Sequence, residues 1–340
     1  MTVSGKYHYL YQKSYGVKIA QIDDFLPDGI TTNEDIITQN QLRLKDEWVQ
    51  KSIGIRQRHW CKNGETASDL GAKALRKVLP SKSSLEGLIV STVSEDVMTP
   101  STACIIQSKA TPGELYPAFD IKAACAGFIF ALDMGRRMIQ TGAKKIACVA
   151  TETRSYYLDK KDRRTVMLFG DGAAAVILEK TQKDEIGIFY SHLISDGRFW
   201  DAIFVPASGG LIQARNEAPK NSIVMNDASG IFDSAILKMQ ELINNALTEC
   251  KLTKNDIDHF IIHQASKNIV AKVADELKLD PSQFTINFDQ VGNITSASVG
   301  VLLSQCLKEK RIKKGDLICL IATGGGYSAG IILLRWEQDL

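Results

Sequence analysis

A cysteine set among very small residues is the strongest chemical signal in this sequence. Residues 120–130 read DIKAACAGFIF, so alanines and a glycine surround Cys125. The stretch before it, 117–121, is typical of a strand, and the stretch that begins with Cys125 has the periodicity of a helix. The free N–H groups and the dipole of a helix N-terminus favour a thiolate, and small neighbours let a substrate approach. We therefore expect Cys125 to be a nucleophile, whereas the other six cysteines fit ordinary buried packing.

A nucleophilic cysteine needs other groups to manage protons and charge, and three later stretches offer them. His263 ends the predicted strand in IIHQAS, and Asn293 lies in the turn VGNITSAS. The glycines of ATGGGYSAG (322–330) could direct backbone N–H groups at an oxyanion. Each signal alone also has a structural interpretation, as a buried histidine, a turn asparagine or a hairpin glycine.

Strand-like and helix-like stretches alternate along the chain, which favours layered α/β architecture with parallel strands. The expected strands cover 16–22, 87–93, 117–121, 145–151, 172–179, 186–194, 258–264, 284–289, 316–323 and 329–336. Each half ends in a similar pair of strands around a glycine-rich turn, which indicates a duplicated fold. The charged stretch 181–187 is the expected seam, so the predicted halves are 1–181 and 182–340.

Composition excludes several classes of function. The 340 residues carry a formal net charge of only +2, without the basic excess of a nucleic-acid-binding protein. The seven scattered cysteines are typical of reduced thiols in a cytoplasmic protein. We find no leader-like or membrane-spanning apolar run. The five histidines lack metal-ligand spacing, and GDGAAA does not open a helix after a strand as a dinucleotide motif would. We expect no metal or organic cofactor.

The motifs taken together are more specific than any of them alone. AACAGF, FGDGAAA, HQA, GNITSAS and GGGYSAG, in this order, resemble the β-ketoacyl-[acyl carrier protein] synthase III family, as do GIRQRHW (54–60), PSTAC (100–104) and SDG (195–197). The resemblance covers nearly everything from about residue 16 onward, and residues 1–15 look like an addition. It implies a thiolase-like fold, with two similar α/β halves in five layers (αβαβα), and usually a homodimer.

The resemblance also implies a mechanism. Cys125 would take an acyl group from acyl-coenzyme A, while His263 and Asn293 would bind the carbonyl of a malonyl thioester, carried by coenzyme A or an acyl carrier protein, as carbon dioxide leaves. The N–H groups of Cys125 and Gly325 would hold the oxyanion of the condensation step. The thioesters are substrates, so no cofactor is implied.

Five further positions match substrate-binding residues of the family. Trp48 and Arg163 match the residues that sandwich the adenine of coenzyme A, and Phe169 matches a wall of the acyl pocket. Thr99 matches the residue that closes the partner subunit's acyl channel, and its small size predicts a primer longer or bulkier than acetyl. Ala265, within HQA, also belongs to the substrate-binding set. Singly, Trp48 and Phe169 could equally be packing aromatics.

The chain departs from the family where an acidic carrier protein would dock. Basic positions of the family are neutral or acidic here, namely Ser52, Asp233, Asn268, Asp275 and Glu276, and HQAN reads HQAS with Ser266. Like charges facing an acidic partner weaken binding. We therefore expect either a dedicated carrier protein or two coenzyme A thioesters as substrates, in a specialised fatty-acid or secondary-metabolite pathway.

Three other functions fit these residues less well than decarboxylative condensation does. An acyltransferase of the same fold, acting on an oxygen or nitrogen acceptor, would be better served by a carboxylate than by Asn293. A non-catalytic subunit of a heterodimeric synthase would not need the set of Cys125, His263 and Asn293. A cysteine protease or hydrolase gives the glycine-rich loops no particular role.

Overall fold

Nine strands form one continuous mixed sheet in the computed structural model, which describes residues 16–62, 64–80, 84–181, 186–206, 214 and 221–337. The strand order is β11-β12-β13-β8-β1-β7-β6-β4-β5. The bounds are β1 (Val17–Phe25), β4 (Leu88–Ser91), β5 (Ala118–Ile121), β6 (Lys145–Thr153), β7 (Asp171–Lys180), β8 (Gly187–Ser195), β11 (His259–Ile262), β12 (Leu317–Gly324) and β13 (Ser328–Arg335). The expected N-terminal addition, 1–15, and residues 182–185 of the expected seam lie outside the described residues. The division into 1–181 and 182–340 stays a prediction.

The two ends of the sheet repeat one pairing pattern. β4 is parallel to β6, which is antiparallel to β7, which is antiparallel to β1. In the same way β11 is parallel to β12, which is antiparallel to β13, which is antiparallel to β8. The prediction of a duplicated fold is confirmed, but the prediction of parallel layers was wrong for most pairs. The turn between β12 and β13 is too short for the crossover that parallel pairing requires.

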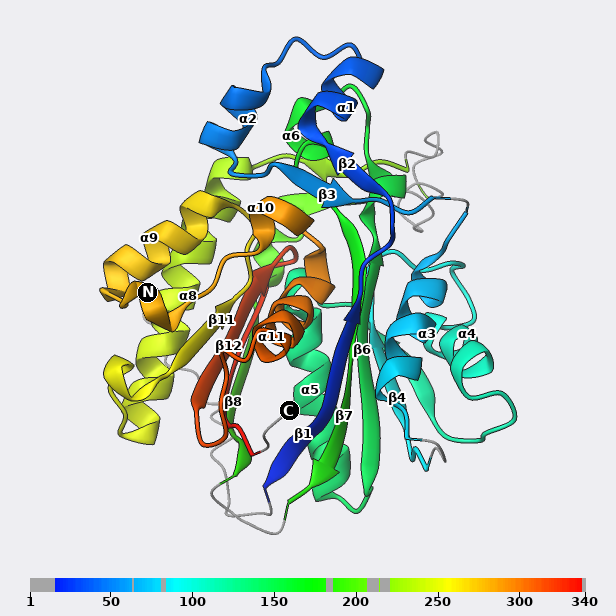
Figure 1. The fold of residues 1–340 in the computed structure, drawn as a ribbon, viewed down its shortest axis with the longest axis vertical. Helices are drawn as coiled ribbons and strands as arrows, with labels where there is room; N and C mark the ends of the chain where they lie inside the picture. The colour runs from blue at the N-terminus through cyan, green and yellow to red at the C-terminus, as the bar shows by residue number, and fades with distance from the viewer. Residues whose placement is uncertain are drawn as a thin grey trace.

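Helices cover both faces of each half and complete five layers, as Figure 1 shows. α3 (Ala67–Val78) and α4 (Thr102–Ala110) lie outside the first half, and α8 (Ala228–Cys250) and α9 (Lys267–Leu277) outside the second. α5 (Gly127–Gln140) and α11 (Ser298–Lys308) form the middle layer. The expected thiolase-like arrangement is confirmed.

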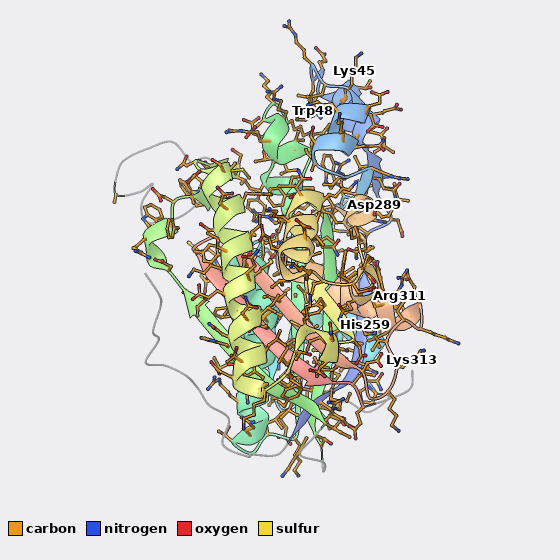
Figure 2. All side chains as sticks on the ribbon, turned by 90° about the vertical axis from the view of Figure 1, so that its left-hand side faces the viewer. Lys45, Trp48, His259, Asp289, Arg311 and Lys313 are labelled. Atoms are coloured by element: carbon orange, nitrogen blue, oxygen red, sulfur yellow. The ribbon has the colours of Figure 1, made fainter. Side chains whose placement is uncertain are left out.

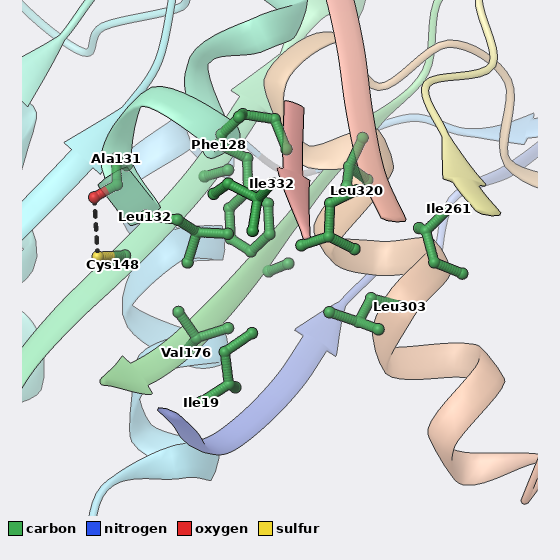
Figure 3. Packing of buried hydrophobic residues seen from close by; sticks show 14 of the residues in the cluster. Ile19, Phe128, Ala131, Leu132, Cys148, Val176, Ile261, Leu303, Leu320 and Ile332 are labelled. Carbon is green, nitrogen blue, oxygen red and sulfur yellow. Dashed lines mark hydrogen bonds between the residues drawn. The ribbon is translucent and has the colours of Figure 1, made fainter. Parts of the chain in front are cut away.

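The middle layer is the main apolar core. Phe128 and Leu132 of α5 pack with Leu303 of α11 and with Leu320 and Ile332 of the second half (Figure 3). Each of these side chains is at most 1 % exposed, and burial of such side chains contributes about 1.5–3 kcal/mol each. This packing therefore fixes α5 and α11, the helices that follow Cys125 and Asn293.

A group of short elements covers one end of the layers, and we call it the cap. It consists of β2 (Ile30–Thr32), α1 (Asn33–Gln39), α2 (Asp46–Ser52), β3 (Gln57–His59) and α6 (Arg163–Val166). Its buried cluster joins Ile36, Val49, Val166 and Met167. Hydrogen bonds from Arg56 N to Asp289 O (2.8 Å) and from Lys267 N to Ile53 O (3.2 Å) tie the cap to the second half.

The strand predicted at 284–289 is wrong. Phe284 makes only an isolated bridge with Phe260, and Phe288–Val291 forms the short helix α10. The Gln264 side chain accepts hydrogen bonds from the N–H groups of Asn287 and Phe288 and donates to Thr285 O (2.6 Å). These backbone groups are thereby removed from any sheet ladder. The remaining strands, β9 (Ile203–Phe204) and β10 (Val224–Met225), pair antiparallel in a separate two-stranded sheet.

None of the helices in the described part of the chain combines the length and apolar character needed to cross a bilayer.

Candidate active site

Cys125 lies in a tight elbow between β5 and α5, as the sequence predicts. Ala124 has a φ of 46°, in the left-handed region that a non-glycine residue seldom adopts, and the 3₁₀ turn η1 (Ala124–Ala126) then leads into the helix. A Cβ on Gly127 would collide with Ser91 Oγ, so glycine is required where the helix packs on the end of β4. Cys125 itself remains partly exposed.

The glycine-rich turn after β12 lies against this elbow. A Cβ on Gly324 would fall 2.5 Å from the backbone nitrogen of Cys125, so no larger residue fits there. Gly325, the residue predicted to supply an oxyanion N–H, is the next residue, and a Cβ on it would lie 2.7 Å from Ile203 Cγ2. Thus Gly324 is the glycine in direct contact with the Cys125 amide, and sequence reasoning did not single it out.

His263 follows β11 and is held beside β12 by a hydrogen bond from its N–H to Ile321 O (2.8 Å). Its side chain is 1 % exposed, and neither ring nitrogen has a partner among the residues that the structure describes. Burial lowers the pKa of His263 to about 4. The imidazole is therefore neutral near pH 7 and can offer one N–H to a ligand.

Asn293 is fixed by its own backbone and by its side-chain oxygen. Its N–H donates to Leu168 O (2.9 Å), and its carbonyl accepts from Gly170 N (3.1 Å). Its Oδ1 accepts from Thr295 N (2.8 Å), which leaves the amide NH₂ as the end that can donate to a ligand. The loop therefore presents a neutral donor, like His263.

The three predicted catalytic residues are brought to one end of the middle layer. The 3₁₀ turn η6 (Thr295–Ala297), two residues after Asn293, packs against η1, and η1 also packs against β12. His263 continues β11 beside the same end of β12. The structure thus assembles Cys125, His263 and Asn293 from three segments that are far apart in the sequence.

The electrostatics of Cys125 correct the expectation of a stable thiolate. Burial raises the pKa of the Cys125 thiol to about 12, and the negative charge of Glu152 adds to this rise. The positive charge of Arg154 and the backbone N–H of Cys125 lower the pKa, but by less. A helix N-terminus usually contributes only about 0.3–1 kcal/mol, too little to offset desolvation. The resting side chain is a thiol.

A buried carboxylate behind the elbow is the main feature that the sequence reasoning missed. Glu152 of β6 is fully buried and accepts hydrogen bonds from Ser296 Oγ (2.6 Å), Ser94 Oγ and Val93 N. Burial raises the pKa of Glu152. Two residues on, Arg154 is buried as well. The available signal was a pair of charged residues ending an apolar strand, because buried charges are rare unless they are held by partners.

The predicted coenzyme A residues lie in the cap. Trp48 of α2 is 49 % exposed, and Arg163, also exposed, begins α6. Their neighbours Val49 and Val166 share the buried cluster of the cap. Figure 2 shows Trp48 and Lys45 on the cap at the top of the view, with Asp289 below them. Arg163, but not Trp48, lines a cavity of about 390 Å³, together with Asn40, Gln41, Leu42, Arg43, Leu44 and Lys161.

The other predicted substrate residues divide between the core and the surface. Phe169 is buried and bridges to Asn293. Ala265 is partly buried between His263 and α9, whereas Thr99 lies on an exposed loop. In the described ranges, no three histidine, cysteine or acidic side chains gather as a metal site would require.

Known proteins share both the sequence and the fold. Two family models match, 3-oxoacyl-[acyl-carrier-protein] synthase III over residues 119–197 and its C-terminal model over 247–336. The β-ketoacyl-[acyl-carrier-protein] synthases III of Koribacter versatilis and Clostridioides difficile are 34% and 35% identical to this chain. Each alignment spans 94% of this chain, and 97% and 98% of those proteins, respectively.

Solved structures agree. The 3-oxoacyl-[acyl-carrier-protein] synthase III of Aquifex aeolicus has a TM-score of 0.85 at 30% identity, covering 94% of this chain and 100% of that one. The priming β-ketosynthase of the R1128 polyketide pathway has a TM-score of 0.86 at 25% identity, covering 96% and 98%. The chain therefore belongs to the β-ketoacyl-[acyl-carrier-protein] synthase III family and is a condensing enzyme of the acyltransferase class.

Proposed function

We propose that this enzyme loads an acyl group from coenzyme A onto Cys125 and condenses it with a malonyl thioester. The observation that carries the proposal is the arrangement around Cys125. Its backbone N–H lies against Gly324, and the unpartnered imidazole of His263 and the amide NH₂ of Asn293 lie at the same end of the middle layer. A nucleophile beside two neutral hydrogen-bond donors fits decarboxylative condensation.

In the loading step, the Cys125 sulfur attacks the thioester carbonyl of the primer. The bond from the acyl carbon to the coenzyme A sulfur breaks, and the proton of the Cys125 thiol passes to the departing coenzyme A thiolate. Because the thiol form dominates at rest, this proton moves during the attack rather than before it. The product is an acyl-Cys125 thioester and free coenzyme A.

In the condensing step, the donors of His263 and Asn293 bind the malonyl thioester carbonyl. The bond from the malonyl α-carbon to its carboxylate breaks, carbon dioxide leaves, and the resulting enolate is stabilised by these donors. Its carbon attacks the acyl-Cys125 carbonyl, whose oxyanion is held by the backbone N–H of Cys125 and, as predicted, that of Gly325. The bond to the Cys125 sulfur then breaks, the thiol regains a proton, and a β-ketoacyl thioester is released.

We also propose a homodimer in which Thr99 reaches the partner's acyl channel. Support comes from β5, which is an edge strand of the described sheet and pairs there only with β4. Exposed apolar side chains gather in and around it, namely Val97, Met98, Leu115 and Phe119. A second copy paired along this edge would cover them.

Coenzyme A would bind through Trp48 and Arg163 of the cap, and the malonyl carrier would be coenzyme A or a dedicated carrier protein. Asp233, Asp275 and Glu276 are all exposed, as the atypical docking surface requires. Lys272, a remaining cation nearby, is paired with Glu276 at 2.7 Å. Titration with a typical acidic carrier protein tests this point, because tight and salt-sensitive binding would contradict it. The seven free cysteines support a reducing, cytoplasmic setting.

Intact-mass spectrometry tests the central proposal. The protein is incubated with a panel of acyl-coenzyme A thioesters, and malonyl thioester is added afterwards. We expect a mass gain equal to the acyl group, its absence in Cys125→Ala, and formation of a β-ketoacyl product on addition of malonyl thioester. Retention of the adduct in Cys125→Ala would contradict the assignment, and an adduct that never condenses would favour a transferase acting on another acceptor.

A further inference from the structure

A guanidinium with few partners lies buried beside the candidate active site. Arg154 begins the 3₁₀ turn η2 (Arg154–Tyr157) directly after β6 and is only 5 % exposed. Its Nη1 donates to Val93 O at 2.9 Å, and its buried Nε has no acceptor within the described structure. No carboxylate of the described residues forms an ion pair with it. A guanidinium has five N–H donors, and buried donors are normally hydrogen-bonded. The Nε–H of Arg154 therefore lacks an acceptor.

Glu152 does not supply that acceptor, although the charge of Arg154 acts on it. Its carboxylate already accepts from Ser296 Oγ, Ser94 Oγ and Val93 N. The positive charge of Arg154 lowers the pKa of Glu152, so the two charges are close enough to interact. Glu152 therefore interacts with Arg154 through charge and is already hydrogen-bonded elsewhere, so the Nε–H of Arg154 keeps no acceptor in the described structure.

The guanidinium is held in the wall of the site by aromatic rings. Its central carbon lies 5.3 Å from the ring centre of Tyr157 and 5.7 Å from that of Phe169. Phe169 in turn bridges to Asn293. The charge of Arg154 also acts on the Cys125 thiol. Aromatic contacts fix the plane of a guanidinium and so prepare its donor fork for one planar ligand.

We propose that Arg154 binds a carboxylate on the acyl primer, so that the enzyme prefers the half-thioester of a dicarboxylic acid to a plain alkyl primer. This inference rests on the proposed acylation of Cys125. A carboxylate matches the guanidinium fork and its charge, whereas an alkyl chain would leave a buried cation without a partner. The malonyl carboxylate is the wrong ligand, because binding it as an anion would oppose its loss as carbon dioxide. The coenzyme A phosphates are not the expected ligand either, because exposed cationic side chains of the cap can bind them.

The test compares primers matched in carbon number. Succinyl-, glutaryl-, adipyl- and suberyl-coenzyme A are paired with butyryl-, valeryl-, hexanoyl- and octanoyl-coenzyme A, and the rate of Cys125 acylation is read by intact mass. We expect at least one half-acid to load about tenfold or more faster than its alkyl partner, since a site built to bind a polar group rejects analogues that lack it. Faster loading of the alkyl member of every pair would overturn the proposal.

Variants link the preference to Arg154. Arg154→Met should reduce the half-acid to alkyl ratio about tenfold or more, and Arg154→Lys, which keeps the charge without the fork, should give an intermediate ratio. Arg311→Met, which removes an exposed arginine paired with Glu309, should leave the ratio unchanged. An unchanged ratio in a folded Arg154→Met would refute the assignment. If that variant does not fold, the wild-type ratio and Arg154→Lys decide.

The same experiment distinguishes failure of the proposed function from failure of the inference about Arg154. If no primer of either kind acylates the protein, or if adducts persist in Cys125→Ala, the acyl-enzyme itself is refuted and the role of Arg154 with it. If alkyl primers acylate Cys125 efficiently and half-acids do not, the proposed function stands and only the inference about Arg154 is wrong.

Discussion

The chain makes the same backbone elbow twice, once in each half. In the first half, Ala124 adopts a left-handed φ of 46° and η1 leads into α5; in the second, Thr295 adopts a φ of 50° and η6 leads into α11. Both helices belong to the middle layer and pack on both halves of the sheet. Ser296 consequently occupies in the second elbow the place that Cys125 occupies in the first.

The two elbows differ in what surrounds that central side chain. Cys125 is partly exposed to the candidate site, whereas Ser296 is fully buried and donates a hydrogen bond to Glu152 (2.6 Å). One elbow presents the proposed nucleophile, and the other anchors the loop that carries Asn293. We infer that the first copy of the elbow is reactive and the second is supporting, and Glu152 links the two because its charge also acts on Cys125.

Removal of the link between the elbows should have the largest effect. In Glu152→Ala, the hydroxyls of Ser94 and Ser296 and the N–H of Val93 would lose their buried acceptor. We expect a loss of about 3–5 kcal/mol in the free energy of unfolding, measured by urea denaturation. Glu152→Gln, which retains one acceptor oxygen, is the matched control and should lose less. Equal stability of Glu152→Ala and wild type would break the proposed connection.

The site in front of the first elbow should make the protein sensitive to acid. His263 has a pKa of about 4 when folded, against about 6.5 when unfolded, so the unfolded state binds the proton first. The stabilisation is complete above pH 6.5 and is lost as the pH falls toward 4, by about 3 kcal/mol in total.

Urea denaturation between pH 7 and pH 4.5 measures this loss. His263→Gln should show a shallower decline in the free energy of unfolding across that window, whatever its stability at pH 7. Parallel curves for the variant and the wild type would show that His263 is not the buried neutral group described above.

Disturbing only the first elbow should reduce activity more than stability. In Gly324→Ala, the new Cβ would lie 2.5 Å from the backbone nitrogen of Cys125 and displace it. We expect a loss of about 1–3 kcal/mol in stability and about 100-fold in acylation rate. Gly197→Ala is the matched control, because a Cβ there meets only open space and its backbone is not left-handed. Normal acylation by Gly324→Ala would argue against the contact.

The smallest expected effects are the stability changes on truncating the central side chains of the two elbows, Cys125 and Ser296. Ser296→Ala removes the donor to Glu152 and should cost about 1–2 kcal/mol of stability. Cys125→Ala removes a partly exposed thiol and should change stability by less than about 1 kcal/mol. The two variants are compared by thermal and urea unfolding. A larger loss in Cys125→Ala than in Ser296→Ala would reverse the roles assigned to the elbows.

Local patterns were enough to predict the first elbow. The small residues around Cys125, the strand before His263 and the turn at Asn293 are all encoded within a few neighbouring positions, and the order of the motifs supplied the fold. The second elbow was not predicted, because TSA and AAC share little sequence although they share a backbone. A left-handed alanine or threonine leaves no reliable signal in the residue types.

Long-range partners could not be predicted from the sequence. Gln264 converts the expected strand at 284–289 into a bridge and a short helix by binding its backbone. Glu152 and Arg154 end an apolar strand, but nothing in their neighbourhood specifies that one finds donors and the other lacks an acceptor. The pKa of Cys125 likewise depends on burial by distant segments rather than on its position at a helix start.

Locating the acyl group tests the account most directly. The enzyme is acylated with the best primer, digested and analysed by peptide mass spectrometry. The proposed mechanism predicts the adduct on the peptide that contains Cys125 and its release when malonyl thioester is added. An adduct on any other residue, including Ser296 or another cysteine, or an adduct on Cys125 that malonyl thioester does not discharge, would contradict it.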